Sequence, residues 1–249
     1  KAQLAQEISR TCSRRFNPPV IVRVGANWRM VFSERVRYRV LAGCARHSCN
    51  NQKLCGDSYQ YFSDGQGHEV AVLSDGMGTG GRAAVDGTMA ADVFSDLMKA
   101  GIGFDSALKI VNSALVVKSV DESLATLDVL SLDLYTGSVE FYKAGAPMSF
   151  VRREGDVIPI DAPGVPVGIL EEAKFHKINE EIDAGDLIIL LSDGALSSGA
   201  NWIADKISGW DDRMPQELAE SIVAEAVARR VDGHDDDITV LVFKLIDNH

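Results

Sequence analysis

Two apolar runs with the same ending dominate the hydrophobic pattern of this chain. Residues 70–73 and 187–191 are almost wholly apolar, and both are followed by Ser-Asp-Gly, which places Asp75 and Asp193 directly after them. Short apolar runs bounded by turn residues are typical of buried strands. A single Asp-Gly after a strand would be an ordinary turn, but the acidic residues 235–237 also adjoin an apolar run. The pattern therefore predicts three buried strands that each carry an aspartate at one end.

A predicted hairpin adds a fourth aspartate. Residues 58–62 and 68–73 have strand-like composition, and the glycine-containing segment between them is typical of a turn. In an antiparallel pair, the start of the first strand lies beside the end of the second. We therefore expect Asp57 to lie beside Asp75.

The rest of the pattern alternates between helices and strands. Apolar residues at helical spacing predict helices at 82–99, 105–115 and 216–229. Runs of strands that enclose a helix pair favour an α+β layered fold over a doubly wound sheet. Further strands are expected at 20–24, 36–42, 126–134, 139–143, 150–153, 157–160, 175–182 and 238–243, with an irregular turn at 27–35.

The N-terminal residues predict a separate segment. Apolar spacing over Leu4 to Phe16 predicts a short helix that ends at Asn17-Pro18-Pro19. The sequence begins with Lys1 and shows no signal-peptide pattern. We therefore expect residues 1–19 to be a linker helix that follows an upstream region, and residues 20–249 to form one functional domain.

Composition narrows the class of protein. At 249 residues and 46% hydrophobic, the chain can bury one sizeable core, and no apolar run approaches the ~20 residues that span a bilayer. Acidic residues outnumber basic ones 36 to 25, a net charge of -11, which argues against nucleic acid as the main partner. The four cysteines form no C-x-x-C motif, so reduced thiols are favoured over disulfides or a zinc site.

The four aspartates have a chemical consequence if they meet. Carboxylates ~4 Å apart at an effective dielectric near 20 repel by about 4 kcal/mol per pair, so their convergence requires cations. Ligands that are all oxygen, including a carbonyl at Gly76, favour Mg²⁺ or Mn²⁺ over zinc. Two such ions can activate a water and bind phosphoryl oxygens. The set therefore predicts a hydrolase of phosphate esters.

The motifs around these aspartates resemble those of a known family. Gly56-Asp57, Ser-Asp-Gly-Met-Gly at 74–78, Leu-Ser-Asp-Gly at 191–194 and Asp-Asp-Ile-Thr-Val at 236–240 are similar, in order and spacing, to the metal motifs of the metal-dependent, type 2C-like (PPM) protein serine/threonine phosphatases. The likeness extends from about Arg37 to Leu245. Residues 123–128 and 164–168 most resemble the stage II sporulation protein E branch of this family.

The resemblance implies a fold and a set of metal ligands. The fold would be an α-β-β-α sandwich of two mostly antiparallel sheets flanked by helices. Asp75 would bridge two Mn²⁺ or Mg²⁺ ions, while the Gly76 carbonyl and Asp57 would hold one of them, Asp57 directly or through water. Asp193 and Asp236 would hold the other ion. A metal-activated water would then attack phosphorus, so no protein nucleophile is needed.

Other acidic and basic positions near these motifs are candidates for supporting roles or differ from the family pattern. Asp237 stands where many relatives have Asn, and we assign it to the second shell of the metal ligands. Asp128 lies in an apolar strand and is either hydrogen-bonded in the core or second-shell to the metals. Many relatives have an arginine before the first metal acid, whereas here the nearby cation, and the candidate phosphate contact, is Lys53. Gly145-Ala146-Pro147 replaces the motif that binds a third metal in some relatives.

The closer likeness also implies a substrate and a cellular setting. The substrate would be the phosphoserine of an anti-sigma factor antagonist, whose release activates a sporulation sigma factor. Upstream regions would span the membrane and contact the cell-division machinery, which would make this chain the cytoplasmic domain of a membrane-anchored protein. Two alternatives remain open: the same chemistry in a stress-response regulator, and a catalytically idle scaffold at the division septum.

Overall fold

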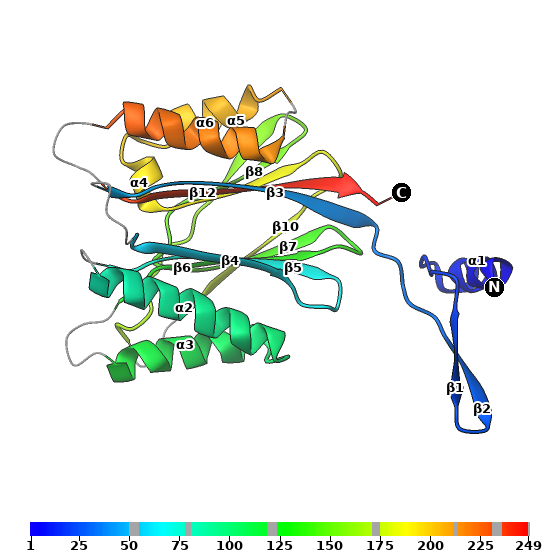
Figure 1. Ribbon diagram of the computed structural model, residues 1–249. Helices are drawn as coiled ribbons and strands as arrows, with labels where there is room; N and C mark the ends of the chain where they lie inside the picture. The colour runs from blue at the N-terminus through cyan, green and yellow to red at the C-terminus, as the bar shows by residue number, and fades with distance from the viewer. Residues whose placement is uncertain are drawn as a thin grey trace.

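The chain forms two stacked, antiparallel five-stranded sheets with helices on both outer faces (Figure 1). The computed structural model describes residues 1–49, 55–77, 81–118, 124–170, 175–211, 214–230 and 236–248. The expected α-β-β-α sandwich is thus confirmed. In spatial order the first sheet contains β10 (His176–Glu181), β7 (Ser138–Ala144), β6 (Leu127–Asp133), β5 (His68–Asp75) and β4 (Asp57–Ser63). The second contains β3 (Tyr38–His47), β12 (Ile238–Asp247), β11 (Leu187–Leu191), β8 (Ser149–Arg153) and β9 (Asp156–Ile160).

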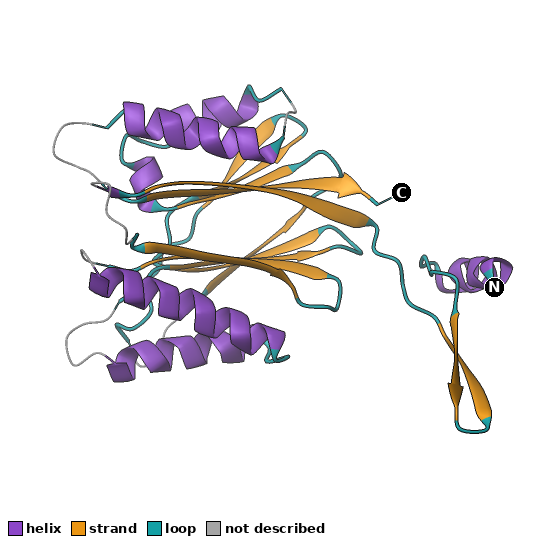
Figure 2. Cartoon of the chain, viewed as in Figure 1, coloured by secondary structure: helices purple, strands orange, loops and turns teal. Residues whose placement is uncertain are grey.

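The helices cover the outer face of each sheet (Figure 2). Helices α2 (Gly81–Lys99) and α3 (Phe104–Lys118) pack on the first sheet, and α5 (Asn201–Ser208) and α6 (Pro215–Ala228) pack on the second. The short helix α4 (Asp193–Leu196) follows β11 directly. No helix in the described part of the chain combines the length and the apolar character needed to cross a membrane.

Three apolar layers hold the sandwich together. The layer between the sheets is built from alternate strand residues, such as Leu130, Phe141, Ile188 and Phe243, all at least 97% buried. The other two layers fill the space between each sheet and its helices. Burying one such side chain stabilises the fold by about 1.5–3 kcal/mol. Strands buried on both faces explain why residues 187–191 are a continuous apolar run.

The N-terminal segment lies beyond one end of the sandwich (Figure 1). It comprises α1 (Ala2–Cys12) and a separate hairpin of β1 (Val20–Val24) and β2 (Asn27–Val31). The expected irregular turn at 27–35 is therefore wrong over β2. The strands pair through a two-residue turn in which Gly25 has φ 63°, and a positive φ at that position is what tight hairpins need. The domain boundary at residue 20 stays a prediction.

Candidate metal centre

The hairpin of β4 and β5 brings two aspartates together. Asp57 and Asp75 are directly paired in the register of these strands, which confirms the expected pairing. The backbone of Asp75 is fixed from the other side, because its N–H donates to the Thr126 hydroxyl at 3.0 Å and its carbonyl accepts from the Thr126 N–H at 2.7 Å. The end of β5 is therefore held between β4 and the start of β6.

Three further aspartates lie next to strand ends of the second sheet. Asp193 begins α4 immediately after β11, and Asp236 and Asp237 immediately precede β12, which pairs with β11. The ends of these strands are tied together, since the Ser192 N–H donates to the Thr239 carbonyl at 3.0 Å and the Thr239 N–H donates to the Ser192 hydroxyl at 2.8 Å. We call Asp57, Asp75, Asp193, Asp236 and Asp237 the acidic rim.

The pKa values show that the two halves of the acidic rim act on one another. Burial, followed by the charges of the other four rim acids, raises the pKa of Asp75 to about 8. Burial also raises the pKa of Asp57 to about 6, with a further rise from the charges of Asp237 and Asp193, although the nearby hydroxyls of Thr239 and Ser192 oppose it. Burial, then the charge of Asp236, raises the pKa of Asp193. The charges of Asp57, Asp75 and Asp193 therefore interact with those of rim acids on other elements.

The rim has the donors of a hard-cation site. Asp57 is 3% exposed, and although the Thr239 and Ser192 hydroxyls are near enough to influence its pKa, neither carboxylate oxygen has a hydrogen bond of acceptable distance and angle among the described residues. A buried carboxylate in that state is costly unless a cation compensates it. Within the described ranges, no three acidic, histidine or cysteine side chains are close enough to form a preassembled metal-binding group. Repulsion between the negatively charged carboxylates favours this wide separation. The all-oxygen donor set fits Mg²⁺ or Mn²⁺.

Helix α2 packs against the backbone of Gly76 without room for side chains. A Cβ on Gly76 would lie 1.8 Å from the Ala83 carbonyl oxygen, and a Cβ on Gly87 would lie 2.6 Å from the Gly56 carbonyl oxygen. A Cβ on Gly56 would lie 3.4 Å from carboxylate oxygens of both Asp75 and Asp237 and 3.8 Å from the Gly76 carbonyl oxygen. The Gly76 carbonyl therefore lies next to the rim carboxylates.

Asp128 lies elsewhere, in a buried ion pair. Its carboxylate accepts from the Lys143 ammonium at 2.7 Å and from the Ser149 hydroxyl at 2.6 Å, and all three side chains are at most 1% exposed. Because Ser149 belongs to β8, these bonds join the two sheets. Of the two roles considered for Asp128, the hydrogen-bonded core role agrees with this geometry. Lys53 falls outside the described residues.

Arg46 is a site residue that the sequence did not indicate. Its guanidinium donates to the Asp57 carbonyl oxygen at 2.5 Å and lies 5.6 Å from the centre of the Tyr59 ring. It also lines, with Asp57 and the first turns of α2, a pocket of about 600 Å³. The predicted strand ended at residue 42, whereas β3 continues to His47, so Arg46 fell outside every expected element.

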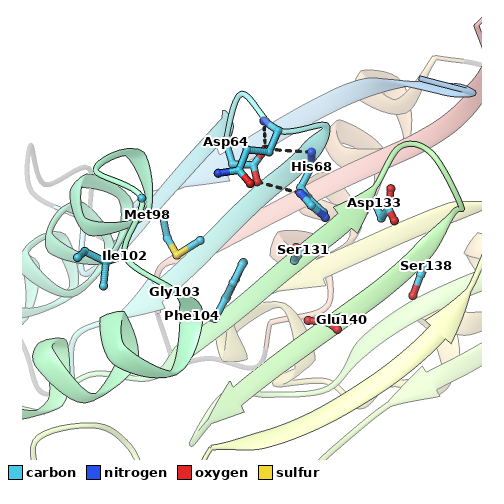
Figure 3. Close-up of a pocket in the computed structure, with 12 residues that line it drawn as sticks. Asp64, His68, Met98, Ile102, Gly103, Phe104, Ser131, Asp133, Ser138 and Glu140 are labelled. Atoms are coloured by element: carbon cyan, nitrogen blue, oxygen red, sulfur yellow. Dashed lines mark hydrogen bonds and ion pairs between the residues drawn. The ribbon is translucent and has the colours of Figure 1, made fainter. Parts of the chain in front are cut away.

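Another pocket lies at the opposite end of the first sheet (Figure 3). It has a volume of about 390 Å³ and contains three acids, all of which already have partners. Asp64 contacts the His68 ring at 2.8 Å, Asp133 accepts from the Tyr135 N–H, and Glu140 accepts from the Tyr142 hydroxyl. These acids are separate from the acidic rim.

Comparisons with known proteins agree with the motifs. The family profile described as "Stage II sporulation protein E (SpoIIE)" matches residues 65–246. The chain is 32% identical over 225 residues to stage II sporulation protein E of Bacillus subtilis, an alignment that covers 88% of this chain and 27% of that protein. The chain thus spans about a quarter of the length of this curated relative.

Solved structures share the fold. A structure of the PP2C phosphatase domain and a fragment of the regulatory domain of SpoIIE from Bacillus subtilis matches with a TM-score of 0.85 at 28% identity, over 99% of this chain and 75% of that one. The structure of RsbX in complex with magnesium matches with a TM-score of 0.66 at 15% identity, over 91% of this chain and 99% of that one. The second likeness concerns the fold alone.

Proposed function

The chain belongs to the stage II sporulation protein E family, and from this premise we propose that it is a metal-dependent protein serine/threonine phosphatase that acts on a phosphorylated anti-sigma factor antagonist. The family is one of PP2C-type phosphatases. One observation carries the proposal for this chain: the buried carboxylate of Asp57, which has no hydrogen bond from any described residue, lies directly beside Asp75 and is influenced by the charges of Asp193 and Asp237.

The proposed ligand roles follow the positions around the rim. Asp75 would contact two Mn²⁺ or Mg²⁺ ions, the Gly76 carbonyl and Asp57 would hold one, and Asp193 and Asp236 would hold the other. When bound, the ions supply positive charge that lowers the pKa of a water and stabilises phosphoryl oxygens. The chain's own contribution is to orient these oxygens, through the Thr126 bonds to Asp75 and the close packing of α2 on Gly76.

The proposed substrate and setting extend beyond the chain. Dephosphorylating the antagonist would free it to activate a sporulation sigma factor. Regions upstream in the full-length protein would anchor it in the membrane, leave this domain in the cytoplasm and contact the cell-division machinery. The net charge of -11 argues against nucleic acid as the main partner.

A metal-dependent assay tests this function. The phosphorylated antagonist, and p-nitrophenyl phosphate as a small substrate, are incubated with the chain and with Mn²⁺, Mg²⁺ or EDTA. We expect phosphate release from both substrates with metal and none with EDTA or with the Asp75→Asn variant. A variant that hydrolyses both substrates at the parent rate would refute the mechanism. If the parent binds no Mn²⁺ in calorimetry, the chain is an idle scaffold instead.

A further inference from the structure

The main chain on both sides of the Asp57 Cα is held by charged side chains, although its carboxylate accepts no hydrogen bond within the described part of the chain. The N–H of the preceding residue, Gly56, donates to Asp237, and the carbonyl of Asp57 itself accepts from Arg46. Arg46 belongs to β3 of the second sheet and Asp237 immediately precedes β12 of the same sheet, whereas Asp57 begins β4 at the edge of the first. A carboxylate at an edge strand is therefore fixed by contacts that cross between the sheets.

Asp237 uses both carboxylate oxygens for backbone amides. One oxygen accepts from the Cys49 N–H at 2.8 Å and the other from the Gly56 N–H at 2.5 Å. Cys49 and Gly56 flank the connection between β3 and β4, so one carboxylate closes both ends of that connection. Asn could not make this arrangement, because its amide nitrogen is a donor and would face a second donor.

Arg46 completes the contact from the neighbouring strand. In the register of β3 and β12, Arg46 is paired with Thr239. Thr239 comes two residues after Asp237, so Arg46 is offset from Asp237 by two positions along the neighbouring strand. Its guanidinium donates to the Asp57 carbonyl at 2.5 Å and lies over the Tyr59 ring. Hydrogen bonds to charged groups are roughly twice as strong as neutral ones, and a planar guanidinium over a ring loses little freedom when it bonds.

We propose that Arg46 and Asp237 are positioning residues that form a two-point main-chain clamp, which holds the Asp57 carboxylate ready for a divalent cation. The clamp spares the carboxylate itself, whose two oxygens stay without protein partners among the described residues. A ligand fixed in advance binds a cation more tightly, because less conformational freedom is lost on binding. This inference rests on the proposed function for the identity of the cation.

The test uses Arg46→Gln and Asp237→Asn with matched controls. Arg39→Gln and Asp247→Asn change the same residue types at the opposite ends of β3 and β12. Manganese affinity is measured by calorimetry, and amide hydrogen exchange is measured on the metal-free proteins. We expect each clamp variant to weaken one of the Mn²⁺ sites about tenfold, equivalent to about 1.4 kcal/mol, while the controls bind as the parent does.

Three further outcomes separate the clamp from a general structural role. Asp237→Asn should speed exchange of the Cys49 or Gly56 amide in the metal-free protein, and Arg46→Lys should recover part of the affinity lost in Arg46→Gln. The double variant should lose less affinity than the product of the single losses, since both side chains act on one ligand. Unchanged Mn²⁺ affinity in both clamp variants, or unchanged exchange at both amides, would overturn the proposal. A parent chain that binds no Mn²⁺ would refute the proposed function, whereas the exchange experiment would still test the clamp.

Discussion

Replacing Asp75 by Asn should stabilise the metal-free protein while it abolishes metal binding. Burial and the charges of the other rim acids raise the pKa of this carboxyl from 3.8 to about 8. At pH 7 the folded protein therefore holds a proton that the unfolded chain releases. Because the folded-state pKa is the higher one, the contribution of Asp75 to stability is fully present below about pH 4 and is lost as the pH rises towards 8.

The size of this effect follows from the pKa difference. In the unfolded chain the Asp75 carboxyl ionises with its ordinary pKa of 3.8, whereas in the folded protein it stays protonated at pH 7. Keeping this proton costs about 1.4 kcal/mol for each pH unit above the unfolded-state pKa, or at most about 4 kcal/mol in total. Asn resembles the protonated carboxyl and binds no proton, so it avoids this cost. In EDTA, Asp75→Asn should therefore have a higher free energy of unfolding than the parent at pH 7, and the difference should shrink towards zero at pH 4.

Urea unfolding in EDTA at several pH values measures this difference, with Asp161→Asn as the control at an exposed aspartate outside the acidic rim. Adding Mn²⁺ at about a hundred times its Kd should stabilise the parent by about 2.7 kcal/mol and leave the variant unchanged, which reverses their order. Equal stabilities in EDTA at pH 7, or a difference of the same size at pH 4, would refute the electrostatic reasoning.

Three other predictions concern single features of the fold. Lys143→Met leaves Asp128 buried without its cation, so the free energy of unfolding measured in urea should fall by about 3–5 kcal/mol. Adding Asp128→Leu to this variant should recover most of the lost stability, and no recovery would contradict the ion-pair account. Gly76→Ala places a methyl group 1.8 Å from the Ala83 carbonyl oxygen. Overpacking of this kind should lower the free energy of unfolding by about 1–3 kcal/mol and weaken Mn²⁺ binding. A thermal melt and a Mn²⁺ titration that match those of the parent would argue against close packing of α2. Mn²⁺ binding at pH 7 should release about one proton, because the pKa of Asp75 is raised to about 8, and it should release fewer protons at pH 9. Calorimetry in two buffers of different ionisation enthalpy measures the number of protons released. Proton release that does not depend on pH would contradict the prediction.

Periodicity and turn chemistry were sufficient for much of the fold. The hairpin around Asp64 is predictable because two segments of strand-like composition flank a turn that contains two glycines, and this pairing alone places Asp57 beside Asp75. The sequence predicts β1 at residues 20–24 but not its partner β2, because the turn between them is only Gly25-Ala26 and β2 buries no residue. An exposed strand lacks the apolar and polar alternation by which strands are recognised.

The acidic rim was partly predictable for a different reason. Aspartates next to apolar runs stand out in the sequence, but the partners of a side chain across a sheet do not. Neither the bonds from Asp237 to two backbone amides nor the contact of Arg46 with the Asp57 carbonyl follows from local spacing. Both depend on how the two sheets stack, which is fixed by packing between segments far apart in the chain.

The pairing of β3 with β12 has a consequence for synthesis on the ribosome. Residues 38–47 must wait for residues 238–247 before their long shared edge can form, and contacts between such distant segments slow folding. A truncated product that stops before residue 236 would lack the strand next to β11 and two of the five rim acids. Only a chain translated beyond residue 237 can therefore assemble the complete rim.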